Sequence, residues 1–192
     1  MEYILLLTAC INPDGMPFTC LADVGVRKKQ YIEALNFYLK NTTRKIVFVE
    51  NSGTDISSSF KDFQHRIEFL CFDGNLCFDK RKGKGYGEAL ILEYAMAKSE
   101  FITDDVLIFK LTGRLQLINI NRLIHYMDKL SPSKNFVCVV PPQNNSVDSR
   151  CFVCNKYYLE NIFLKDKFHI DDSVGYYLSL IHISEPTRHA QI

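Results

Sequence analysis

Tyr3-Ile-Leu-Leu-Leu-Thr8 and Lys45-Ile-Val-Phe-Val-Glu50 are two short apolar runs near the start of the chain. Continuous apolar runs of this length are typical of strands that are buried on both faces of a parallel sheet. Between the two runs, apolar side chains recur at helical spacing over residues 27–40. This strand–helix–strand order predicts an α/β fold that starts with the first residues of the chain.

The same alternation continues along the rest of the chain. Further strands are predicted at 67–72, 106–111, 135–140 and 150–155, and further helices at 57–63, 86–99, 121–130 and 157–167. Strands that alternate with helices of this length favour a mostly parallel sheet with right-handed crossovers and helices on its faces. Because no shift in composition marks a linker, we expect residues 1–177 to form a single domain.

The last residues differ in character from the rest of the chain. Residues 178–188 read Leu-Ser-Leu-Ile-His-Ile-Ser-Glu-Pro-Thr-Arg, which resembles the conceptual translation of a transposase-type sequencing adaptor. We therefore expect residues 178–192 to be a non-native tail and the domain to be truncated at its C-terminus. No functional residue is assigned to this segment, as is usual for appended sequence.

Composition and charge narrow the classes of function. The 192 residues carry 23 basic and 22 acidic side chains, so the formal net charge is +1. So small a net charge argues against a protein that binds nucleic acid through bulk electrostatics. No apolar run approaches the roughly 20 residues that cross a bilayer, and the N-terminus does not read as a signal peptide. We expect a cytoplasmic location, and peripheral contact with the inner membrane face stays open.

Polar side chains follow the first two predicted strands. Thr8 ends the first strand, and Asn51, Ser52 and Asp55 come directly after the second. In open α/β sheets, ligands bind beside the carboxyl-terminal ends of the strands. Hydroxyl, amide and carboxylate groups are therefore expected at one edge of the sheet, where they could bind a nucleotide diphosphate.

A glycine-rich segment, Gly83-Lys-Gly-Tyr-Gly-Glu88, opens the most strongly predicted helix. Unpaired amides at the start of a helix bind anions, and glycines let a phosphate approach the backbone closely. The spacing matches neither the Walker A loop nor the dinucleotide-binding fingerprint. Lys84, Gly85 and Glu88 are candidates for phosphate or ribose contacts, and a solvated basic loop is the alternative.

A second cationic segment, Lys110-Leu-Thr-Gly-Arg114, ends the strand predicted at 106–111. Lys110 and Thr112 fall on the same side of this strand, because side chains alternate along it. Gly113 permits a sharp turn, and the guanidinium of Arg114 could bind two phosphate oxygens at once. The alternative is a surface strand end with two ordinary cations.

Acidic residues near these segments allow two interpretations. Asp104 and Asp105 could be metal ligands or part of a turn, and two adjacent aspartates without a third are a poor metal motif. Asp148 enters the strand at 150–155, where a carboxylate could act as a base or orient an acceptor hydroxyl together with Arg150. A turn-initiating aspartate beside a surface arginine is the alternative.

The order of these segments resembles a known family. The matching segments are Thr8, Phe48-Val-Glu-Asn-Ser-Gly53, Ser57-Ser-Ser-Phe60, Gly83-Lys-Gly-Tyr-Gly-Glu88 and Lys110-Leu-Thr-Gly-Arg114. Taken together, they resemble bacterial glycosyltransferases of capsule and O-antigen synthesis, over about residues 3–177. The resemblance implies a Rossmann-like fold of the GT-A type. It also implies transfer of a sugar from a nucleotide-sugar donor to a polysaccharide or lipid-linked acceptor.

The resemblance assigns roles to the candidate residues. Many enzymes of this kind hold Mn²⁺ or Mg²⁺ on an Asp-x-Asp motif, but this chain has the segment 110–114 in that place. Cations would then stabilise the departing diphosphate, so no cofactor is expected. A divalent metal remains possible, and Asp104 and Asp105 are its candidate ligands. The expected catalytic residues are Lys110, Arg114 and Asp148, with Arg150 orienting the acceptor. The expected donor-binding residues are Thr8, Asn51, Ser52, Asp55, Lys84, Gly85, Glu88, Thr112 and Gly113.

Two other classes of protein remain open. A nucleotidyltransferase would use a similar nucleotide-binding α/β sheet to form a sugar nucleotide from a nucleoside triphosphate and a sugar phosphate. A non-catalytic module would bind the nucleotide without turnover. The two enzyme classes differ in direction, because a nucleotidyltransferase forms the sugar nucleotide that a glycosyltransferase consumes.

Overall fold

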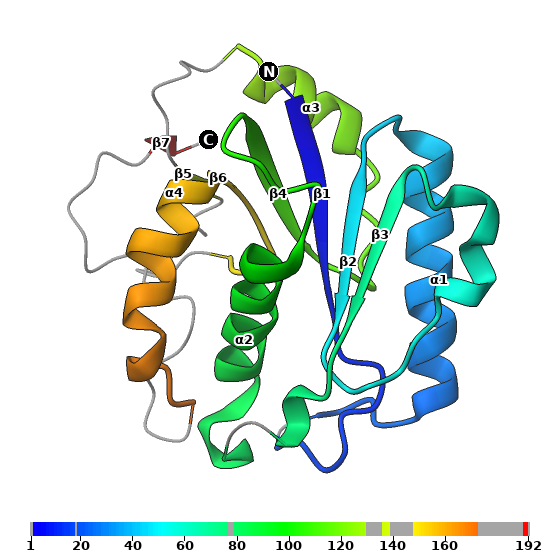
Figure 1. The fold of residues 1–192 in the computed structure, drawn as a ribbon, viewed down its shortest axis with the longest axis vertical. Helices are drawn as coiled ribbons and strands as arrows, with labels where there is room; N and C mark the ends of the chain where they lie inside the picture. The colour runs from blue at the N-terminus through cyan, green and yellow to red at the C-terminus, as the bar shows by residue number, and fades with distance from the viewer. Residues whose placement is uncertain are drawn as a thin grey trace.

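We describe the fold from a computed structural model of the chain (Figure 1). The structure describes residues 2–17, 19–76, 79–129, 136–138, 148–172 and 190–191. Within these residues, seven strands form a single sheet in the order β3-β2-β1-β4-β6-β5-β7. The strands are β1 (Glu2–Ala9), β2 (Ile46–Glu50), β3 (Ile67–Cys71), β4 (Val106–Thr112), β5 (Phe136–Cys138), β6 (Cys151–Asn155) and β7 (Ala190–Gln191).

The sheet is mostly parallel, as predicted. β1 pairs in parallel with β2 on one side and with β4 on the other, and β2 pairs in parallel with β3. β6 is antiparallel to both of its neighbours, β4 and β5. This arrangement confirms the prediction of an α/β domain with a Rossmann-like sheet flanked by helices.

Helices lie on both faces of the sheet. They are α1 (Val24–Asn41), α2 (Gly83–Lys98), α3 (Ile120–Met127) and α4 (Lys156–Tyr158), which continues as a π-helical turn (Leu159–Phe163) and a 3-10 turn (Leu164–His169). α1 covers one face, and α2 and α4 lie together on the other (Figure 1). Short 3-10 helices occupy Ser57–Phe63, Gly74–Leu76 and Lys80–Lys82. Within the described part of the chain, no helix has both the length and the apolar character needed to cross a bilayer.

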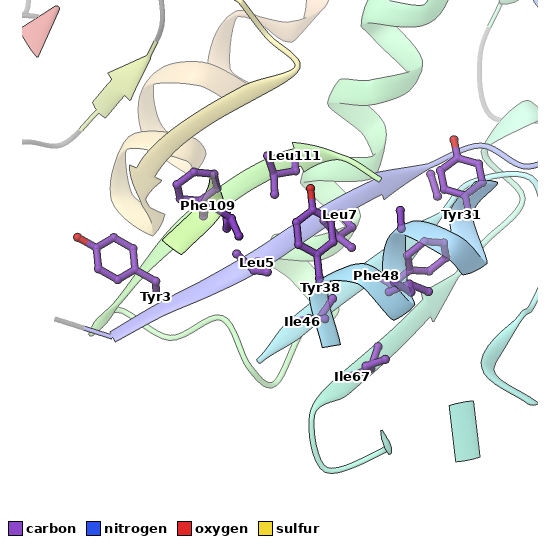
Figure 2. Packing of buried hydrophobic residues seen from close by; sticks show 14 of the residues in the cluster. Tyr3, Leu5, Leu7, Tyr31, Tyr38, Ile46, Phe48, Ile67, Phe109 and Leu111 are labelled. Atoms are coloured by element: carbon purple, nitrogen blue, oxygen red, sulfur yellow. The ribbon is translucent and has the colours of Figure 1, made fainter. Parts of the chain in front are cut away.

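The central strand β1 contributes to two hydrophobic layers. Leu5 and Leu7 face α1, where they join the cluster that contains Tyr38 (Figure 2). Ile4 and Leu6 face the other way, into the cluster built around α2 and the helical turns after β6. Because successive side chains of a strand point to opposite faces, a strand covered on both faces must be apolar throughout. The packing therefore accounts for the continuous apolar run at the start of the sequence.

Two features differ from the sequence-based expectation, and two predicted segments lie partly outside the described residues. β6 lies between β4 and β5 and runs antiparallel to both. The helix predicted at 157–167 is not regular, because it passes from α through π to 3-10 turns. Only residues 136–138 of the strand predicted at 135–140 are described. The predicted tail, 178–192, lies outside the described residues except for Ala190–Gln191, which pairs in parallel with β5.

Candidate functional site

A cavity of about 370 Å³ opens beside the carboxyl-terminal ends of β1 and β4. The loop after β1, the start of α1, the start of α2 and the turn after β4 form its walls. This is the edge at which open α/β sheets bind ligands. The predicted site residues that line the cavity are Thr8, Asn51, Lys84, Glu88, Thr112 and Arg114.

The loops around the cavity are organised by the buried carboxylate of Glu50, the last residue of β2. Its Oε1 accepts a hydrogen bond from the amide of Ile11 at 2.8 Å. Its Oε2 accepts from the amides of Ser52 at 2.9 Å and Thr54 at 2.8 Å. A buried charge must be satisfied by hydrogen bonds, and here the backbone of two loops supplies them. Glu50 therefore fixes the loops after β1 and β2 against one another.

Arg27, in the first turn of α1, holds the rest of the loop after β1. Its Nε donates to the carbonyls of Cys10 at 2.9 Å and Ile11 at 3.1 Å, and its Nη1 donates to the carbonyl of Leu21 at 3.1 Å. The guanidinium is buried and lines the cavity, so it adds positive charge there while it orders the loop. Sequence analysis did not identify Arg27, because on a helix it reads as one more surface cation.

Tyr31 lies one turn further along α1 and also lines the cavity. Its hydroxyl accepts a hydrogen bond from the amide of Cys10 at 3.0 Å. Burial raises the pKa of the Tyr31 phenol, so the group is neutral at physiological pH. The sequence pattern showed Tyr31 only as a member of an apolar helix face. Tyr31 follows Arg27 by four residues, and residues with this spacing share one face of a helix. The spacing could therefore have indicated that both side chains lie at the same site.

Glu88 of α2, Lys110 of β4 and Thr8 of β1 form a polar network beneath the cavity. The Lys110 Nζ donates to Glu88 Oε1 and to the carbonyl of Ser149 at 2.5 Å. Thr8 Oγ1 donates to the same Glu88 oxygen at 2.9 Å. Lys110 is completely buried and does not line the cavity, whereas Glu88 and Thr8 do. The expected contact between Lys110 and a diphosphate is therefore not what the structure shows, because this cation pairs with Glu88.

Asn51 has a fixed backbone and an unpaired side-chain oxygen. Its amide donates to the carbonyl of Ala9 at 3.1 Å, and its carbonyl accepts from the amide of Gly74 at 2.8 Å. Only 2% of its surface is exposed, and Oδ1 accepts a hydrogen bond from none of the described residues. Buried polar atoms without a partner are rare in proteins, which makes Asn51 a candidate for ligand contact.

The turn after β4 brings Arg114 to the cavity. Arg114 is half-buried, and it forms no ion pair with any described residue. The amide of Gly113 donates to the carbonyl of Thr8 at 2.8 Å, and a Cβ added at Gly113 would lie 2.8 Å from that same oxygen. Glycine is thus required for β1 and β4 to approach closely, which is a structural role and not the expected ligand contact. Thr112 lines the cavity, and exposed Lys84 does so from α2.

Several predicted site residues lie away from the cavity and have structural partners. Ser52 Oγ accepts from the amide of Asn12 at 2.9 Å. Asp55 accepts from the amide of Ser57 at 2.7 Å and so begins the 3-10 helix at Ser57–Phe63. These two residues therefore stabilise the loop after β2, and the structure does not place them where a ligand in the cavity would touch them.

The start of α2 is occupied by a carboxylate of the protein itself. The amide of Gly85 donates to Asp172 Oδ2 at 3.2 Å, and the amide of Asp172 donates to the carbonyl of Lys82 at 3.0 Å. A Cβ at Gly83 would lie 2.3 Å from Asp172 Oδ2, so this contact also requires glycine. The predicted phosphate contact at Gly85 is therefore replaced by an internal cap.

The remaining acidic candidates also have other partners. Asp148 forms an ion pair with Arg150 at 2.7 Å, and this neighbouring guanidinium lowers the pKa of the Asp148 carboxyl. Neither of these residues lines the cavity. Asp104 and Asp105 are exposed and precede β4, at the opposite end of that strand from the cavity, so they cannot hold a metal in it. In the described part of the chain, no group of three His, Cys, Asp or Glu residues could hold a metal ion.

Comparison with known proteins gives likeness in structure but none in sequence. No protein-family model matches the chain, and no curated protein matches it. A cytidylyltransferase from Leptospira borgpetersenii serovar Hardjo-bovis (strain JB197) matches with a TM-score of 0.49 and 12% identity over 100% of this chain and 76% of that one. A 4-diphosphocytidyl-2C-methyl-D-erythritol synthase matches with a TM-score of 0.50 and 8% identity over 99% of this chain and 88% of that one.

These matches correct the function expected from the sequence. At such low identity the likeness shows the fold alone, which is a Rossmann-like α/β fold. The prediction of a capsule or O-antigen glycosyltransferase is wrong, because the solved structure that shares the fold is a 4-diphosphocytidyl-2C-methyl-D-erythritol synthase and not a glycosyltransferase. The expected glycan or lipid-linked acceptor loses its support with that prediction.

Proposed function

We propose that the protein is a nucleotidyltransferase that forms a sugar nucleotide from a nucleoside triphosphate and a sugar phosphate. The observation that carries the proposal is the position of Arg114, Lys84 and Arg27 around one cavity at the carboxyl-terminal edge of the sheet. Three cations around a concave site suit a ligand with several phosphate charges. A volume of about 370 Å³ lies in the range of small-molecule sites. The shared fold with a solved synthase supports the same class.

The proposed reaction is a single transfer at phosphorus. A phosphate oxygen of the sugar phosphate attacks the α-phosphorus of the nucleoside triphosphate and forms a new P–O bond. The bond between the α-phosphorus and the bridging oxygen breaks, and pyrophosphate leaves with the electron pair. Negative charge grows on the leaving oxygen, so preorganised cations beside it accelerate the reaction.

Arg114 and Lys84 are assigned different parts in this reaction. Arg114 follows β4 directly, and its half-buried guanidinium has no ion-pair partner among the described residues, so it can bind two oxygens of the triphosphate. Lys84 is exposed at the start of α2 and can add positive charge from the opposite wall. We further propose that these cations stabilise the leaving group, in place of a metal ion bound by aspartates. Turnover that persists in EDTA supports this point, and turnover that EDTA abolishes and Mg²⁺ restores contradicts it.

Pyrophosphate release tests the function. The chain is incubated with each of the four common nucleoside triphosphates and a panel of sugar phosphates, and pyrophosphate is measured by a coupled assay. We expect release only when both substrates are present. Pyrophosphate formation with none of the combinations, by a chain that circular dichroism shows to be folded, would remove the proposal. Nucleotide binding without any release would favour the non-catalytic module.

A further inference from the structure

We infer that Glu88 and Asn51 form a subsite for two neighbouring hydroxyl groups of the ligand. This inference rests on the proposed function, because it places either the ribose of the nucleotide or the sugar of the sugar phosphate at the inner end of the cavity. Both residues line the cavity, and both carry an oxygen that can accept a hydrogen bond from a hydroxyl.

The carboxylate of Glu88 is held with one oxygen engaged and the other available. Thr8 Oγ1 and Lys110 Nζ both donate to Oε1. None of the described residues donates to Oε2, and the side chain keeps 21% of its surface exposed. Because the Lys110 ammonium is completely buried against it, the pair is neutral as a whole. Glu88 therefore offers a rigid acceptor to the cavity without a net negative charge that would repel the ligand.

Asn51 supplies the second acceptor. Hydrogen bonds on both sides, to Ala9 and from Gly74, fix its backbone, and its Oδ1 is buried without a partner. A buried acceptor that none of the described residues satisfies calls for another donor, which a ligand can supply. A hydroxyl or an amino group can provide that donor, whereas a phosphate oxygen cannot.

The two acceptors are brought together by the end of β1. Glu88 accepts a hydrogen bond from the side chain of Thr8, and the backbone amide of Asn51 donates to the carbonyl of Ala9, the next residue. Consecutive Cα atoms lie about 3.8 Å apart, so the side chain of Glu88 and the backbone of Asn51 are held by adjacent residues of one strand. A ring with vicinal hydroxyls offers two donors, and carboxylate and amide oxygens are well suited to accept from them.

Charge then sets the direction of the ligand in the cavity. The acceptors belong to the buried end of the lining, where Asn51 and Thr8 are almost inaccessible. Lys84 is exposed and Arg114 is half-exposed, so these two cations lie toward the opening, whereas the buried Arg27 guanidinium is engaged by backbone carbonyls. A molecule that carries hydroxyls at one end and phosphates at the other therefore enters with its hydroxyls first and leaves its phosphates beside these cations.

Matched ligand pairs test this subsite by titration calorimetry in the absence of divalent metal. One arm compares CTP with 2′,3′-dideoxy-CTP, and the other compares glucose 1-phosphate with its 2-deoxy analogue. In at least one arm we expect the hydroxylated ligand to bind on the order of tenfold more tightly or better, because its analogue leaves a buried acceptor unpaired. The arm that shows the preference identifies the source of the hydroxyls. Equal affinities within both pairs would overturn the inference and leave the proposed function intact.

Two variants connect the preference to the named residues. Asn51→Leu removes the acceptor at similar size, and Glu88→Gln turns Oε2 into a donor, so each is expected to reduce the preference toward one. Asn161→Leu, an exposed position on the helical turns after β6, is the control and should leave the preference unchanged. A preference that survives both site variants would also overturn the inference. Failure of the wild-type chain to bind either pair would remove the subsite together with the proposed function.

Discussion

The ammonium group of Lys110 lies completely buried against the carboxylate of Glu88, beneath the floor of the cavity. The pair joins β4 to α2, and Thr8 of β1 donates to the same carboxylate oxygen. Lys110, one of the two cations in the segment 110–114, therefore forms its ion pair inside the fold. Of these two cations, Arg114, at the other end of that segment, is the one that lines the cavity.

The first prediction concerns the stability of this pair. Lys110→Met should lower the free energy of unfolding by about 2–3 kcal/mol, because it leaves the Glu88 carboxylate partly buried without its counter-charge. Urea titration followed by circular dichroism measures the loss. Lys29→Met is the control, since Lys29 and Glu33 form an exposed pair at 3.9 Å, and it should change stability by no more than about 0.5 kcal/mol. Equal effects of the two substitutions would show that the buried pair is not ionised as described.

The second prediction concerns Asn51. Asn51→Leu should keep the stability of the wild type or raise it by about 1 kcal/mol, because an unpaired buried oxygen is replaced by an apolar group of similar size. The same variant should lose affinity for the hydroxylated ligand. Thermal unfolding of the two proteins without ligand measures the first effect. A clear loss of stability would mean that the Asn51 side chain stabilises the fold and is not available to bind a ligand.

Arg114 is the subject of the third prediction. Arg114→Ala should reduce kcat on the order of 100-fold and leave the unfolding curve unchanged, because a preorganised donor to the developing charge is lost. Arg114→Lys should also be impaired, since a point charge cannot form the two parallel hydrogen bonds of a guanidinium. Arg150→Ala is the control, because Arg150 pairs with Asp148 outside the cavity. Wild-type kcat in Arg114→Ala would exclude the proposed role, and a loss in Arg150→Ala would bring Asp148 back as a candidate.

The sequence predicted the framework of the fold well for a physical reason. Strands covered on both faces must be continuously apolar, and the runs at 3–8, 45–50 and 106–111 each became a buried strand. The direction of β6 could not be predicted in this way. The alternation of strands and helices gives the order of elements along the chain, whereas the insertion of β6 between β4 and β5 is decided by tertiary packing.

The candidate site was predicted in part. Side-chain alternation gives the face on which Lys110 lies but not its depth, so its burial under Glu88 was not foreseen. Arg27 and Glu50 were missed, because their partners are backbone groups of loops whose path only the fold determines. Gly85 was placed correctly at the start of a helix, but the cap comes from Asp172, far away in the sequence.

A fourth prediction follows from the two carboxylates with opposite pKa shifts. Burial raises the pKa of Asp172 above its ordinary value of 3.8, so the folded protein holds this proton more tightly than the unfolded chain. Stability is then lost as the pH rises from that value through the raised pKa. Asp172→Asn should therefore gain stability relative to the wild type as the pH increases across this window.

Asp148 provides the comparison for this measurement. Its pKa is lowered by Arg150, so its contribution is present above 3.8 and is lost as the pH falls through the lowered pKa. Asp148→Asn should therefore lose a small amount of stability relative to the wild type near neutral pH, since its partner Arg150 is largely exposed to solvent. Unfolding curves recorded from pH 3 to pH 7 compare the two variants. The same sign for both would contradict the assignment.

The fifth prediction uses a cysteine as a probe of the cavity. Cys20 is exposed and lines the cavity, whereas half-buried Cys71 lies outside it. A nucleoside triphosphate bound in the cavity should slow the alkylation of Cys20 by iodoacetamide several-fold and leave the rate at Cys71 unchanged. Peptide mass spectrometry gives both rates in one experiment. Equal rates at Cys20 with and without a nucleotide that calorimetry shows to be bound would place the nucleotide elsewhere.

The fate of labelled phosphate tests the central claim most directly. The chain is incubated with a sugar phosphate and a nucleoside triphosphate that carries ³²P at either the α or the γ position. A nucleotidyltransferase must place the α-label in a sugar nucleotide and release the γ-label as pyrophosphate, in equal amounts. A folded chain that releases the γ-label as inorganic phosphate, or that forms no labelled sugar nucleotide with any pair of substrates, would contradict the account.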